Sequence, residues 1–147
     1  NNAIYTWTGS TYASYVNGVS NGSGLDQYIA PGQAFWVQTQ DDFVSGSMTI
    51  EYANTSVDGT PGFLKTNPDM ARLTVEETNG SKKDHAVVRF ENQSTTSFDG
   101  NWDAHKLPGG AEYPSLYVDL SGSYYSICST PLSTYTFPVG FDQSEQN

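Results

Sequence analysis

The sequence contains little cysteine and little positive charge. Cys128 is its one cysteine, so no disulfide can form within the chain. Six Lys and Arg residues face sixteen Asp and Glu residues, which gives a formal net charge of −10. Binding to a phosphate backbone needs clustered Lys and Arg. The charge balance therefore argues against a nucleic-acid partner.

Long apolar runs and a helical period are also missing from the sequence. No apolar run approaches the roughly 18 residues of a membrane span, so we expect no membrane insertion. Aromatic residues make up 14% of the chain and charged residues only 15%, a balance that does not suit disorder. At 147 residues, the chain is predicted to form a single domain over residues 1–147.

Alternating apolar and polar residues separated by turn residues dominate the chain and predict short strands. Two pairs of such runs, 4–8 with 11–16 and 72–78 with 85–91, are close enough to form hairpins. Further strands are predicted at residues 34–39, 47–52, 115–120, 124–128 and 135–141. The pattern indicates an all-β fold, an antiparallel β-sandwich of jelly-roll type with about nine or ten short strands.

The same alternation predicts which side chains face the interior. We expect the run at residues 34–39 to be a central strand with Trp36 in the core, and Cys128 to be a buried small side chain. Pro138 marks the last strand as an edge or a bulge. Of the neighbours Tyr124 and Tyr125, one is expected on each face of its strand.

Carbohydrate binding is the main function that the residue types indicate. Sugar rings present C–H faces that stack on Trp and Tyr, while Asn, Gln and Asp satisfy the hydroxyl groups. The candidate ligand-binding residues are Tyr5, Trp7, Tyr12, Tyr15, Trp102 and Tyr124. The alternative is that aromatic pairs in the first hairpin only stabilise the sheet through cross-strand contacts.

A second candidate site lies in the loop around residue 100. Asp99, Asn101 and Asp103 alternate like the opening of a calcium-binding loop, and calcium prefers such oxygen ligands. The glycine and the bidentate Glu of a helix–loop–helix site are not at the required spacing. The alternative is a turn in which Asp99 and Asp103 accept main-chain hydrogen bonds.

Catalytic signals are weak. Gly18 to Gly22 match the Gly-x-Ser-x-Gly pattern, but they lie in a polar, glycine-rich loop and not in a strand-to-helix turn. The adjacent carboxylates Glu76 and Glu77 point to opposite faces of a predicted strand. A small hydrolase would have to use His85 or His105 with Cys128 or an acidic partner. We therefore expect that the protein is not an enzyme.

Several segments, in this order, resemble a β-rich domain that is frequent in large secreted proteins of Bacteroidetes-type bacteria. Residues 28–37 are similar to its "I-A-P-G-Q-G-F-F-V" strand, and residues 4–7 are similar to its "I-Y-x-W" hairpin. Residues 95–107 are similar to its "A-T-x-x-F-D-x-x-x-D-A-x-K-L" region. Ala34 and Trp36 stand where Gly and Phe are commoner, and the segment that usually precedes Ile4 is missing.

The resemblance implies a non-catalytic module of a larger bacterial protein that is secreted by the type IX system or held at the cell surface. It also implies a sandwich that is incomplete at its N-terminal edge. The residue types of Asp99, Asp103 and Lys106 predict a hydrogen-bonded corner, which is the alternative to calcium binding. The expected partners are a polysaccharide or another cell-surface polymer, or neighbouring domains or subunits of the same protein.

Two functions remain open from the sequence: a glycan-binding module, and a purely structural or adhesive spacer or fibre unit. The exposure of the three Trp side chains separates them. Two or more exposed and coplanar Trp rings would favour glycan binding, whereas three buried ones would favour a structural unit.

Overall fold

The structure, a computed structural model, describes residues 2–22, 25, 27–39, 46–51, 69–78, 80–131 and 136–142. These residues form ten strands and no helix, which confirms the predicted all-β, sandwich-like fold. It follows that no described helix is long and apolar enough to cross a membrane.

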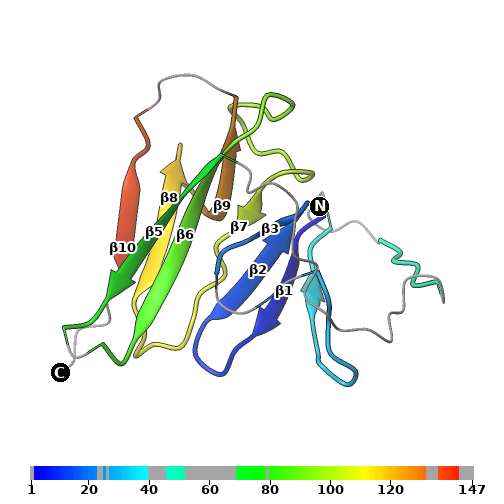
Figure 1. Cartoon of the computed structure of the whole chain (residues 1–147), viewed down its shortest axis with the longest axis horizontal. Helices are drawn as coiled ribbons and strands as arrows, with labels where there is room; N and C mark the ends of the chain where they lie inside the picture. The colour runs from blue at the N-terminus through cyan, green and yellow to red at the C-terminus, as the bar shows by residue number, and fades with distance from the viewer. Residues whose placement is uncertain are drawn as a thin grey trace.

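Two sheets lie beside one another (Figure 1). The strands of the first, in the order β3-β2-β1-β4, are Ile4–Trp7 (β1), Tyr12–Val16 (β2), Val19–Ser20 (β3) and Trp36–Val37 (β4). The second sheet has the order β10-β8-β9-β6-β5, with β7 paired to β9 outside this path. Its strands are Met70–Glu76 (β5), Lys83–Phe90 (β6), Ala104–His105 (β7), Ser115–Leu120 (β8), Ser123–Thr130 (β9) and Val139–Asp142 (β10).

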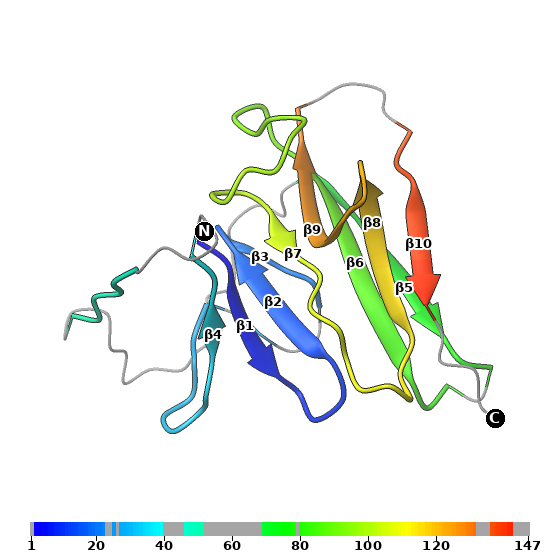
Figure 2. The ribbon, with the colours of Figure 1, turned by 180° about the vertical axis from the view of Figure 1, so that it is seen from behind.

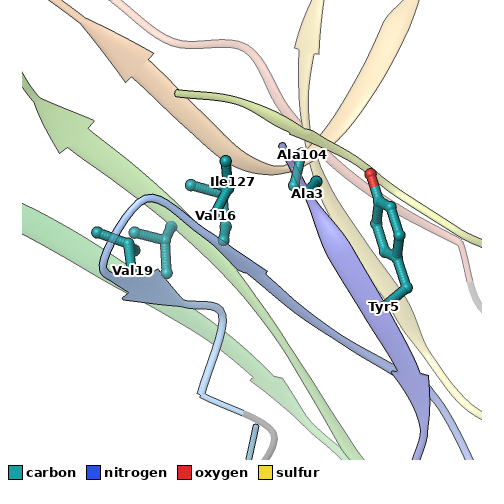
Figure 3. Packing of buried hydrophobic residues seen from close by; sticks show 7 residues of the cluster. Ala3, Tyr5, Val16, Val19, Ala104 and Ile127 are labelled. Carbon is teal, nitrogen blue, oxygen red and sulfur yellow. The ribbon is translucent and has the colours of Figure 1, made fainter. Parts of the chain in front are cut away.

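An inter-sheet core joins the two sheets. Its buried members are Ala3, Tyr5, Val16, Val19, Val87, Ala104 and Ile127. In Figure 3 the side chains of Val16 and Ile127 meet between β2 and β9, and the ring of Tyr5 extends from β1 toward β7. Alternation explains these positions, because every second residue of β1 and β2 points toward the second sheet.

A second core fills the concave side of the six-stranded sheet. This sheet curls so that β5 crosses β8, in front of it in Figure 1 and behind it in Figure 2, and the two strands are in contact. The buried members of the second core are Ala86, Val88, Leu116, Val118, Tyr125 and Cys128. Leu73, Val75 and Phe90 pack against them, as the alternation in these strands predicts.

The pairing of β6 with β9 departs from the predicted antiparallel arrangement. These two central strands are parallel, with Val87 opposite Ile127 and Phe90 opposite Thr130. The other pairings among the described strands are antiparallel. A parallel pair requires a long crossover, and here the intervening chain supplies β7 and β8.

The predicted central strand at residues 34–39 is wrong. Only Trp36 and Val37 form a strand, and β4 lies at the edge of the four-stranded sheet. Trp36 is 44% exposed instead of lying in the core, because β4 pairs with β1 over two residues on the side away from β2. Residues 47–51 form no strand, and residue 52 lies outside the described residues.

The N-terminal strand is not at an edge of its sheet. β1 lies between β2 and β4, with Ile4 opposite Tyr15 on one side and Val37 on the other. The edge strand predicted near Pro138 is β10, which begins at the next residue.

Truncation of Ile127 tests the inter-sheet core. Ile127→Ala removes a fully buried side chain at the contact of β9 with the four-stranded sheet. We expect the free energy of unfolding to fall by about 2–5 kcal/mol in chemical denaturation. Ile50→Ala is the matched control, since Ile50 is 65% exposed, and we expect a change within about 0.5 kcal/mol. Equal losses in the two variants would contradict this core.

Candidate functional site

Three aromatic side chains form a partly exposed cluster on the four-stranded sheet, here called the aromatic patch: Trp7, Tyr12 and Trp36. The ring centroids of Trp7 and Tyr12 lie 5.0 Å apart, and those of Tyr12 and Trp36 lie 5.3 Å apart. Tyr12 is half-buried, while Trp7 is 40% exposed and Trp36 is 44% exposed. The patch therefore presents two Trp rings on either side of a Tyr ring.

Strand register explains why these side chains meet. Trp7 lies directly opposite Tyr12, and Trp36 lies opposite Tyr5 on the other side of β1. Tyr5 and Trp7 are two residues apart and share one face. Tyr5 is buried in the inter-sheet core, and Tyr12 packs against that core. The patch is therefore the exposed continuation of the core along the same face of the sheet.

The other predicted glycan-binding residues lie outside the patch. Tyr5 is only 1% exposed, so its ring belongs to the core and is not available to a ligand. Tyr15 lies on the opposite face of β2 from Tyr12, because the two are three residues apart. Trp102 is half-buried and its ring covers the guanidinium of Arg89 at 4.6 Å.

Tyr124 is exposed, but it lies on the six-stranded sheet, where its ring is 4.2 Å from that of Tyr117. Its neighbour Tyr125 is buried, as the alternation predicts. The sequence thus identified Trp7 and Tyr12 and missed Trp36. No local pattern marked Trp36 as exposed, because the run of four apolar residues between Gln33 and Gln38 suits a buried strand as well as an edge strand.

The loop at residues 99–103 is closed by its own hydrogen bonds. The main-chain N–H groups of Asp99 and Ser129 donate to the two carboxylate oxygens of Asp103, at 2.8 and 2.6 Å. The N–H of Asn101 donates to Asp99 at 3.0 Å, and the side-chain oxygen of Asn101 accepts from Asn2 at 3.0 Å. Within the described ranges, no three His, Cys, Asp or Glu side chains gather as a metal site would require. The geometry favours the hydrogen-bonded turn, and calcium at these residues stays a prediction.

Lys106 does not join the corner predicted with Asp99 and Asp103. Its ammonium instead contacts Asp84 of β6, which is fully buried. The carboxylate of Asp103 instead ties the loop to β9 through its bond to Ser129.

The side chains that a hydrolase would use, His85, His105 and Cys128, each contact other residues of the fold. Nδ1 of His85 lies 2.9 Å from the hydroxyl of Thr74, and the ring of His105 is stacked against those of Phe98 and Tyr125, which also contact each other. Burial lowers the pKa of both His side chains. Cys128 is buried in the second core, as predicted, and burial raises the pKa of its thiol to about 12. A thiol with this pKa supplies little of the thiolate that acts as a nucleophile.

Comparison of the chain with protein-family models, with curated proteins and with solved structures found no match.

The buried carboxylate of Asp103 should give stability a specific pH dependence. Burial raises the pKa of Asp103 to about 6, above the value of about 4 in an unfolded chain. The protonated carboxyl group of Asp103 therefore favours the folded state. The stability that this protonation contributes is lost as pH rises from about 4 to about 6. Over that range we expect the free energy of unfolding to fall by up to about 3 kcal/mol relative to Asp103→Asn, which cannot titrate there.

The comparison uses urea denaturation of both proteins at several pH values, with a chelator present. The difference in the free energy of unfolding between wild type and Asp103→Asn cancels the contribution of the other carboxylates. If this difference stays constant between pH 4 and pH 7, the shifted pKa of Asp103 is contradicted.

Proposed function

We propose that this chain is a non-catalytic carbohydrate-binding module of a secreted or cell-surface bacterial protein, and that the aromatic patch is its contact surface. The observation that carries the proposal is the exposure of Trp7 and Trp36 on either side of Tyr12. Large exposed aromatic rings in one cluster are uncommon without a partner. The resemblance of residues 28–37 and 95–107 to a secreted bacterial module supports the location.

The tilt of the rings narrows the class of carbohydrate. The Trp7 and Tyr12 planes are inclined by 62°, and the Tyr12 and Trp36 planes by 86°. Tyr12 is thus coplanar with neither Trp, and the three rings do not form a flat platform. Such a surface fits a single polysaccharide chain, whose successive sugar rings can face in different directions, better than the flat face of a crystalline polymer.

Polar groups for sugar hydroxyls lie close to the patch in sequence. Thr8 and Ser10 follow Trp7 in the turn between β1 and β2, with their hydroxyls 3.3 Å apart. Gln38 follows Val37 and is exposed. Carbohydrate recognition needs this combination of apolar ring faces and hydrogen-bonding side chains.

Removal of one Trp ring tests the proposal. In affinity electrophoresis against a panel of soluble polysaccharides, we expect at least one polymer to retard the wild-type protein. Trp7→Ala and Trp36→Ala should each weaken binding to that polymer by about tenfold, which corresponds to about 1.4 kcal/mol. Tyr124→Ala is the matched control, because Tyr124 is equally exposed but lies on the other sheet.

Circular dichroism and thermal melting should show that each variant remains folded. If no polymer retards the folded wild-type protein, the proposal fails. If Tyr124→Ala weakens binding while the two Trp variants do not, the contact surface is on the six-stranded sheet and not at the patch.

A structural or adhesive module is the second candidate. Its support is the exposed edge strand β10, on which Val139 and Phe141 are 45% and 58% exposed. Exposed apolar edge strands pair readily with another chain. Sedimentation of the same samples distinguishes this role, since it requires association that grows with protein concentration.

A further inference from the structure

Asp84 and Lys106 form a buried ionic contact between β6 and the segment that follows β7. The Asp84 side chain is fully buried and that of Lys106 is 6% exposed. Oδ2 of Asp84 accepts hydrogen bonds from Nζ of Lys106 and from the main-chain N–H of Leu116, the latter at 2.6 Å. Oδ1 of Asp84 is buried and has no hydrogen-bond partner among the described atoms.

This arrangement is costly for two charged groups. The attraction between a buried carboxylate and a buried ammonium offsets their desolvation free energy only when the geometry is excellent and the remaining polar atoms have hydrogen bonds. Here one carboxylate oxygen has no partner within the described part of the chain. Conversion of the pair into a neutral amide would remove both buried charges and release the unpartnered oxygen as water.

We propose that Lys106 and Asp84 condense into an intramolecular isopeptide bond. The Lys106 ammonium turns from Oδ2 of Asp84 to the unpartnered Oδ1 and passes a proton to it, which leaves a neutral amine and a neutral carboxyl group. Nζ then attacks Cγ, the Nζ–Cγ bond forms, and negative charge develops on Oδ2. A second proton from Nζ reaches Oδ1, the Cγ–Oδ1 bond breaks, and one water molecule leaves. The step needs neither an oxidant nor a reductant.

The surroundings of the pair favour this step. Direct contact of Nζ with the carboxyl group replaces a bimolecular encounter by an intramolecular one. The Leu116 N–H already points at Oδ2 and stabilises the charge that develops there. Burial also lowers the pKa of Lys106, which raises the fraction of neutral, nucleophilic amine. Exclusion of water from the site protects the amide once it has formed.

The bond would give the domain a covalent cross-link that its cysteine content cannot provide. It would join β6 to the segment after β7 across 22 residues of chain. A disulfide cannot do this, because Cys128 is the one cysteine of the sequence. A cross-link within a domain stabilises it by restricting the unfolded chain.

Mass spectrometry of the purified protein, after incubation under native conditions, tests the proposal. We expect an intact mass that is lower than the sequence mass by one water molecule. Trypsin does not cleave after an acylated lysine, so digestion should yield a branched peptide that joins residues 84–89 to residues 90–147. Lys106→Arg should have the full sequence mass, since a guanidinium does not form this amide.

Two controls make the result specific. Lys82→Arg should still lose water, because Lys82 is more exposed than Lys106 and lies 3.7 Å from Glu77. Cyclisation at Asp99-Gly100 could also release water, but it would persist in Lys106→Arg and would give no branched peptide. The wild-type digest is decisive even if Lys106→Arg does not fold. Unbranched peptides that contain unmodified Asp84 and Lys106 would overturn the proposal and leave a buried ion pair.

Discussion

The parallel contact between β6 and β9 is the constraint on which the rest of the structure depends. These two strands lie at the centre of the six-stranded sheet, and most of their residues are buried. Val87 and Ile127 face the four-stranded sheet, whereas Val88 and Cys128 face the second core. Both cores therefore share one pair of strands, and β1, β2 and β3 pack against one face of this pair while β8 and β5 pack against the other.

Polar side chains fix the segments that cross this double core. Asp103 binds the main chain of β9, and Asp84 binds the main chain of β8. Arg89 donates to the carbonyl oxygen of Asn17 at 2.9 Å and is covered by Trp102, so it connects the two sheets beside the inter-sheet core. Each of these side chains has at least one specific partner, although Oδ1 of Asp84 and Nε of Arg89 have none among the described atoms. Together they set the register of segments that apolar packing alone would leave free to slide.

Local pairings could be predicted from the sequence, and distant ones could not. The predicted hairpins β1–β2 and β5–β6 join neighbouring segments whose alternation and turn residues agree, and both are present. The parallel pair β6–β9 and the edge pairing of β4 with β1 depend on long-range contacts that leave no local pattern. In the candidate site, too, the locally placed residues could be predicted and the distant one could not. Trp7 and Tyr12 belong to one hairpin, whereas Trp36 joins them only through the register of β4.

Tyr12 belongs to two environments at once. Its side chain packs against the inter-sheet core on one side and touches both Trp rings of the patch on the other. A molecule that bound the patch would therefore also restrain a side chain that closes the core. Under the proposed function, ligand binding at the patch and cohesion of the two sheets are thermodynamically linked, so the sheets should resist separation most strongly in the bound state.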